Sequence, residues 1–121
     1  MLDSAFETVN STVVPTMKLS QVIELVPDNI EYIEILKIDA EGFDLQILKS
    51  AEDHIARVAL ITVECTNGHL FKNGYKPQEI QKFLMSKNFK IIPDSQIAGT
   101  ESFINLKYEK ELPNISFRVK S

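Results

Sequence analysis

The sequence predicts an α/β fold built on a mixed, mostly parallel sheet with flanking helices. Short apolar runs of strand type alternate with amphipathic helical patterns along the chain, which is typical of strand–helix–strand units. One run, residues 58–63, is almost entirely apolar and β-branched, as expected of a strand covered on both faces. The length of 121 residues suits a single domain that spans residues 1–121.

The first part of the chain is predicted to hold an extended segment, a helix and a strand. Residues 8–14 are rich in β-branched types, which favour an extended backbone. Apolar residues recur at helical spacing over 19–26, with Ser20 as a suitable N-cap and Pro27 as a stop. The apolar run 33–38 then predicts a strand.

The remaining elements follow the same alternation. Apolar residues form one helical stripe over 43–55, and the run 58–63 predicts the next strand. Pro77 suits the first turn of a further helix, because its missing N–H costs nothing there. Residues 89–92 and 102–108 are two more strand candidates.

Composition and charge argue against several classes of protein. The formal net charge of −4 is unlike that of a nucleic-acid binder, which carries a basic patch. No apolar run is long enough to span a membrane. Cys65 is the only cysteine and no secretory leader begins the sequence, so we expect a cytoplasmic chain. Residues 109–121 mix charges of both signs and are predicted to form an edge strand or a solvated tail.

Polar residues follow two neighbouring predicted strands at the point where each strand ends. Asp39 and Glu41 have the same parity, so an extended backbone would direct both carboxylates to one side. Gly42 permits a turn with positive φ. The second strand is followed by residues 64–69, Glu-Cys-Thr-Asn-Gly-His. Ligands of open α/β sheets bind beyond the carboxyl ends of the strands, so the candidate site is predicted there.

The turn after the first strand carries a family resemblance. Residues 37–44, Lys-Ile-Asp-Ala-Glu-Gly-Phe-Asp, strongly resemble the K-I-D-x-E-G-x-E-like turn of the FkbM family of methyltransferases. Residues 14–20 resemble the family's lead-in, although Ser20 stands where an aspartate is usual, and 61–64 and 102–106 resemble later strands. The resemblance runs in register over residues 13–108.

The resemblance implies a partial Rossmann-like methyltransferase fold, of which this chain would be the C-terminal portion. It also implies S-adenosylmethionine as methyl donor and an acceptor hydroxyl on a sugar, lipid or polyketide-like molecule. A carboxylate at the reaction centre could take the acceptor's proton or orient its hydroxyl. The residues implied are catalytic Asp39, Glu41 and His69, cofactor-binding Asp39 and Gly42, and substrate-binding Glu64 and Asn67.

One feature of the family is missing. The four glycines, at 42, 68, 74 and 99, form no glycine-rich cluster of the kind that lets the backbone approach a cofactor. The cofactor half is therefore expected to be absent and the chain inactive alone. Strand 33–38 would then be an exposed apolar edge, covered by the 8–14 segment, by a second copy in a homodimer, or by the missing N-terminal half.

Other interpretations of these residues stay open. The chain could be a non-catalytic dimerising or binding remnant of the fold. Asp39, Glu41 and Glu64 could form a magnesium-type site, although carboxylates at strand ends are common without a metal and none is expected here. Asp44 is explained by the helix dipole, which favours acids in the first turn.

Overall fold

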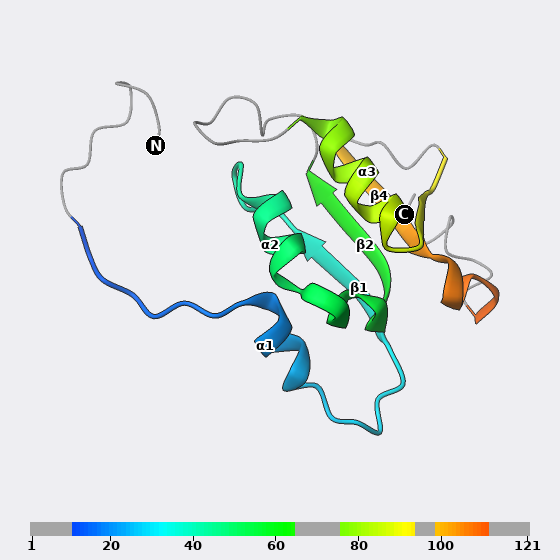
Figure 1. Ribbon diagram of the computed structural model, residues 1–121, viewed down its shortest axis with the longest axis horizontal. Helices are drawn as coiled ribbons and strands as arrows, with labels where there is room; N and C mark the ends of the chain where they lie inside the picture. Colours follow the sequence, from blue (N-terminus) through cyan, green and yellow to red (C-terminus); the bar gives the residue numbers. More distant parts are fainter. Residues whose placement is uncertain (1–10, 65–75, 94–98, 112–121) are drawn as a thin grey trace.

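The computed structural model describes residues 11–64, 76–93 and 99–111. Its four strands form one sheet in the order β1-β2-β4-β3, with three α-helices beside it (Figure 1). In chain order the elements are α1 Leu19–Glu24, β1 Ile33–Ile38, α2 Asp44–Ser50, the 3₁₀ helix η1 Glu52–Arg57, β2 Val58–Glu64, α3 Pro77–Ser86, β3 Phe89–Ile91, β4 Thr100–Asn105 and the 3₁₀ helix η3 Leu106–Glu111.

The direction of the strands confirms the predicted α/β fold with a mixed sheet. β1 and β2 are parallel, whereas β4 is antiparallel to both of its neighbours, β2 and β3. It follows that β1, β2 and β3 point one way and β4 alone is reversed. The segment 92–99 joins β3 to β4 and is too short for the crossover that a parallel neighbour would need. Because β1 and β2 are parallel, their carboxyl ends lie side by side at one end of the sheet, where the candidate site is predicted.

The two faces of the sheet bury different side chains. On one face, the core residues of α2 and α3, Leu48, Ile80 and Leu84, pack with Ile61 and Phe103 of the strands. Figure 1 shows α2 and α3 lying over the same face. All five side chains are fully buried, which accounts for the apolar spacing of both helices. A smaller cluster on the other face contains Ala59, Leu60, Ile92, Ile104 and Tyr108.

The helix predicted at 43–55 is interrupted. α2 ends at Ser50, and η1 continues from Glu52, whose φ of 54° is left-handed. The apolar stripe is nevertheless buried on both sides of the break, since Leu48, Ala51 and Ile55 are 0%, 0% and 1% exposed. The pattern therefore predicted the buried face correctly but not the change of helix type.

Ser20 is not the N-cap of α1. The helix begins after Lys18, and Ser20 lies inside it, 4% exposed. The free N–H at the start of the helix is bound from another element instead, because Leu19 N donates to Ser50 Oγ at 3.0 Å. A long-range partner has replaced the local cap that the sequence suggested.

The predicted strand 102–108 is displaced. β4 runs from Thr100 to Asn105, and η3 follows it. The side chain of Asn105 explains where the strand ends, because Nδ2 donates to Ala56 O at 3.1 Å and Val58 O at 3.0 Å. Its Oδ1 accepts from Lys107 N at 3.0 Å, which turns the chain into η3.

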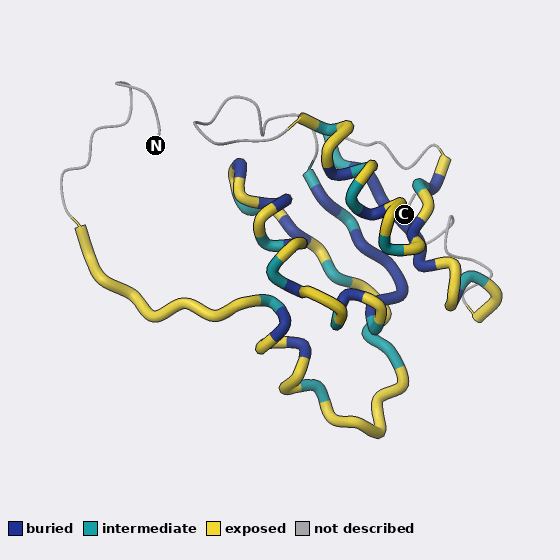
Figure 2. The backbone as a smooth tube through the Cα atoms, in the orientation of Figure 1, coloured by how far each residue is buried: buried dark blue, intermediate teal, exposed yellow. Residues whose placement is uncertain are grey.

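The described residues of the segment before α1, 11–18, do not cover the edge of the sheet. Residues 11–18 contain no strand and run away from β1 (Figure 1). They are exposed along their length until α1 (Figure 2), and Val13 is fully exposed. Residues 8–10 and the predicted edge strand or tail from 112 onward lie outside the described residues, whereas 109–111 belong to η3. β1 is thus an edge strand of the described sheet.

Within the part of the chain that the structure describes, no helix has the length and apolar character needed to cross a membrane.

Candidate active site

Three carboxylates meet where β1 and β2 end. Asp39 and Glu41 follow β1, and Glu64 is the last residue of β2. Each offers one oxygen, and these oxygens lie within 4.8 Å of one another. Parallel pairing explains the meeting, because Ile38, the last residue of β1, lies opposite Val63, and β2 ends one residue later at Glu64, so the carboxyl ends of both strands lie side by side. The structure therefore brings together the three acids that the sequence placed after neighbouring strands.

The turn between these acids is not the extended segment that parity assumed. Glu41 has a φ of 48° and Gly42 a φ of 98°, so both are left-handed. Phe43 N donates to Ala40 O at 3.2 Å and closes the turn. Gly42 has the positive φ predicted for it, whereas Glu41 adopts one without that freedom, at a cost of about 1–2 kcal/mol. Glu52 and Asn88, outside this site, also have a positive φ, so the conformation of Glu41 does not by itself mark a functional residue.

Asp44 supports the turn from inside the protein. Its side chain is fully buried at the start of α2, and Oδ2 accepts the N–H of Ala40 at 3.2 Å. The other oxygen, Oδ1, is buried and has no hydrogen-bond partner among the residues that the structure describes. The helix dipole, which explained Asp44 from the sequence, accounts for an acid in the first turn but not for its burial. The sequence held one clue to this role, since Asp44 closes the same motif that contains Asp39 and Glu41.

The chemistry of the three acids is that of acceptors and negative charge. Asp39 and Glu41 are exposed, Glu64 is half-buried, and neither exposed acid forms an ion pair with a described residue. Carboxylates in this arrangement can accept a hydroxyl's hydrogen bond, take its proton or attract a cation. They are also the oxygen ligands that magnesium prefers. The positions of these three acids are compatible with hydroxyl binding, proton acceptance and magnesium binding alike.

Two predicted site residues cannot be placed. Asn67 and His69 lie in the stretch 65–75, outside the described residues. Their predicted roles in substrate binding and catalysis stay predictions, as do the roles of the described acids.

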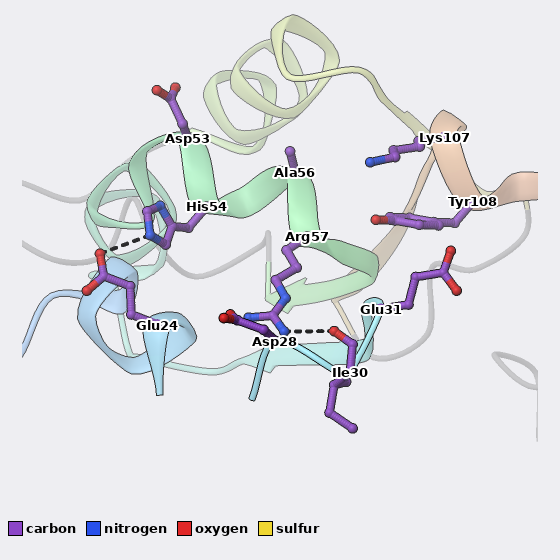
Figure 3. Close-up of a pocket in the computed structure, with 10 residues that line it drawn as sticks. All are labelled: Glu24, Asp28, Ile30, Glu31, Asp53, His54, Ala56, Arg57, Lys107 and Tyr108. Atoms are coloured by element: carbon purple, nitrogen blue, oxygen red, sulfur yellow. Dashed lines mark hydrogen bonds and ion pairs between the residues drawn. The ribbon is translucent and has the colours of Figure 1, made fainter. Parts of the chain in front are cut away.

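A separate recess lies at the opposite end of the strands, where β1 and β2 begin, and none of the predicted site residues lines it. It has a volume of about 480 Å³ and is lined by the segment 24–31, η1 and η3 (Figure 3). His54 is partly exposed there and pairs with Glu24, with Nε2 and Oε1 2.9 Å apart. Lys107, which also lines the recess, lies over the ring of Tyr108, with Nζ 5.3 Å from the ring centroid.

Arg57 organises that recess. Its Nη1 donates to Ile23 O at 3.4 Å and Val26 O at 3.0 Å. Its Nη2 donates to Pro27 O at 2.6 Å and Ile30 O at 2.7 Å. These carbonyls belong to the end of α1 and the segment after it, so the contact fixes that segment to η1. We call these four hydrogen bonds the Arg57 clamp.

Comparison with known families places most of the chain in one family. The family model described as the methyltransferase FkbM domain matches residues 2–91, a span that contains the acidic turn, β1 and β2. No curated protein and no solved structure matches the chain.

Proposed function

The chain belongs to the FkbM methyltransferase domain family, and we propose that it is part of an S-adenosylmethionine-dependent O-methyltransferase. Its acceptor would be a hydroxyl-bearing small molecule of the sugar, lipid or polyketide-like class. One observation carries the proposal. The carboxylate oxygens of Asp39, Glu41 and Glu64 lie within 4.8 Å of one another, at the edge of the sheet where α/β proteins bind ligands.

Each residue of the site has a proposed role. S-adenosylmethionine, when bound, supplies an electrophilic methyl group. Asp39 accepts the proton of the acceptor hydroxyl, and Glu41 orients that hydroxyl by accepting its hydrogen bond. Glu64 binds the acceptor from the end of β2. In the stretch 65–75, Asn67 would bind the acceptor as well, and His69 is a second candidate for the base.

The residues fit only one part of the cofactor. The exposed carboxylate of Asp39, which has no ion pair with a described residue, suits the cationic groups of S-adenosylmethionine. The buried Gly42, with its φ of 98°, has no Cβ to obstruct a ligand near the turn. No glycine-rich turn is present in the 121 residues to receive the remainder. We therefore infer that residues outside these 121 complete the cofactor site and join the sheet at the β1 edge.

This inference predicts that the 121 residues alone bind the cofactor poorly. Calorimetric titration of the purified chain with S-adenosylmethionine, and separately with S-adenosylhomocysteine, is expected to give no saturable heat and a Kd above about 1 mM, because only the acidic edge is present. Circular dichroism of the same sample controls for folding. Saturable one-to-one binding in the micromolar range would contradict the inference and place a whole cofactor site within this chain.

A second candidate function is a non-catalytic dimerising module. The observation that favours it is the position of β1 at the edge of the described sheet, with Ile35 50% exposed. An apolar edge strand is a template for pairing with another strand. Here the second copy would occupy the place that we propose for the cofactor half.

The dimer candidate has its own test. It predicts a dimeric mass by light scattering at high concentration, and a return to the monomer when Ile35 is replaced by lysine, which blocks edge pairing. Met85→Lys is the matched control, because Met85 is a similarly exposed apolar residue, 66% exposed, on α3. A wild-type chain that stays monomeric throughout would remove this candidate and leave the methyltransferase proposal standing.

A further inference from the structure

We propose that Asp44 is a positioning residue of the acidic site, and that its carboxylate holds the turn on which Asp39 and Glu41 lie. The hydrogen bond between Asp44 and the turn is seen in the structure itself. The effect of Asp44 on methyl transfer rests on the proposed function.

The contacts of Ala40 carry the inference. Ala40 is the residue between the two acids, and both of its backbone groups are engaged. Its N–H donates to Asp44 Oδ2 at 3.2 Å, and its C=O accepts from Phe43 N at 3.2 Å. The peptide planes that lead to Asp39 and Glu41 are therefore both fixed, one of them by the side chain of Asp44.

The turn needs such a constraint. Glu41 and Gly42 are both left-handed, with φ of 48° and 98°, and a glutamate adopts this conformation only where its surroundings impose it. Without the acceptor for the Ala40 N–H, we expect Glu41 to return to a common backbone region. Its carboxylate would then leave the group whose oxygens lie within 4.8 Å.

The burial of Asp44 distinguishes it from an ordinary acid at a helix start. Glu79 is the comparison within this chain, because it is exposed in the first turn of α3 and accepts the N–H of Lys76 at 2.6 Å. Asp44 is fully buried, and its Oδ1 accepts no hydrogen bond from any residue within the described ranges. A buried carboxylate with an unpaired oxygen lowers stability, so helix stabilisation alone is a poor reason for it. The burial of Asp44 is better explained by its role in fixing the geometry of the turn.

The first experiment measures the turn directly in the full 121-residue chain. Amide hydrogen exchange of Ala40 and the backbone chemical shifts of Glu41 and Gly42 are compared in wild type, Asp44→Ala and Asp44→Asn. Asp44→Ala is expected to speed exchange at Ala40 about tenfold, the effect of one lost hydrogen bond, and to move the Glu41 shifts away from left-handed values. Asp44→Asn retains an oxygen that can accept the Ala40 N–H and should stay within about threefold of wild type.

Two further variants separate positioning from helix stabilisation. Glu79→Ala removes a comparable helix-start acid and should leave the Ala40 and Glu41 signals unchanged. Should Asp44→Ala fail to fold, Asp44→Ser serves in its place, because serine suits a helix start and has no atom at the Oδ2 position. Unchanged Glu41 shifts in a folded Asp44→Ala or Asp44→Ser chain would overturn the proposal, as would an asparagine variant that behaves like alanine.

The second experiment measures the consequence for catalysis with S-adenosylmethionine as the donor, in the chain supplied with its cofactor half. Asp44→Ala is expected to lower kcat roughly 10- to 100-fold, since a displacement of about 1 Å has effects of this size. The KM for S-adenosylmethionine should change less than about threefold, and asparagine should restore most of kcat. Equal kcat in wild type and Asp44→Ala, with the turn altered, would overturn the catalytic part. Absence of methyl transfer in wild type would instead refute the proposed function, and the exchange experiment would still decide the positioning role.

Discussion

Replacement of Asp39 by asparagine is expected to lower kcat for methyl transfer roughly 100-fold or more, the usual contribution of a positioned general base. Asparagine keeps the size of the side chain but cannot accept a proton. The Asp39 carboxylate is exposed and forms no ion pair with a described lysine, arginine or histidine, so the free energy of unfolding should hardly change. Transfer of labelled methyl from S-adenosylmethionine to a panel of hydroxyl acceptors measures the effect, with the cofactor half supplied as a separate or fused polypeptide.

Two variants make this measurement specific. Glu41→Gln should reduce kcat less than Asp39→Asn, because a glutamine can still orient a hydroxyl through its carbonyl oxygen. Asp53→Asn is the matched control, since Asp53 is an exposed acid of η1 at the opposite end of the strands, and it should leave kcat unchanged. If Asp39→Asn and Asp53→Asn had equal activity, Asp39 would not be the base, and His69 would become the first candidate.

The strands could be predicted from the sequence because a run of apolar, β-branched residues is a local signal. The predicted strands 33–38 and 58–63 correspond to β1 and to β2 without its last residue. Their parallel pairing followed from the helical pattern between them. The break after α2 carried no such signal. Burial follows the stripe of Leu48 and Ile55 through both helix types, and no residue type marks a left-handed glutamate at position 52.

The candidate site was predictable in part for the same reason. Asp39 and Glu64 come together because neighbouring parallel strands end at one edge. Glu41 joins them through a left-handed backbone, although parity had suggested an extended one. The prediction that these acids lie together was correct, whereas the extended backbone assumed for the turn was wrong. The burial of Asp44 was not predictable, because an acid at a helix start is normally exposed, and only tertiary packing encloses this one.

The Arg57 clamp lies beyond any local pattern, since its carbonyl partners stand 27 to 34 residues earlier in the chain. It nevertheless solves a local problem. The segment after α1 forms no helix or strand up to β1, and the carbonyls of Val26, Pro27 and Ile30 in it accept from Arg57. The fourth carbonyl, Ile23 O of α1, also accepts Val26 N at 3.0 Å. A planar guanidinium with several donors suits this task, whereas a lysine presents one point charge.

Replacement of Arg57 by alanine is therefore expected to lower the free energy of unfolding by about 2–4 kcal/mol. Hydrogen bonds from a charged donor contribute about 1.5–3 kcal/mol each, but these four share one side chain and two of the contacts are exposed, so their contributions do not add. Arg57→Lys should fall between wild type and alanine, because it keeps the charge but loses the planar fork. Urea unfolding followed by circular dichroism measures all three proteins.

Amide hydrogen exchange shows which part of the molecule depends on the clamp. In Arg57→Ala, the exchange rates of the α1 amides should increase over wild type by at least as large a factor as those of the β2 amides. The reason is that the lost contacts fix α1 and the segment after it, and not the sheet. Lys82→Ala is the matched control, since Lys82 is an exposed cation on α3, and it should change stability by less than about 0.5 kcal/mol. An alanine variant of Arg57 as stable as that control would mean that water satisfies these carbonyls equally well. The packing of Ile23, which is 2% exposed in the core, would then be what keeps α1 in place.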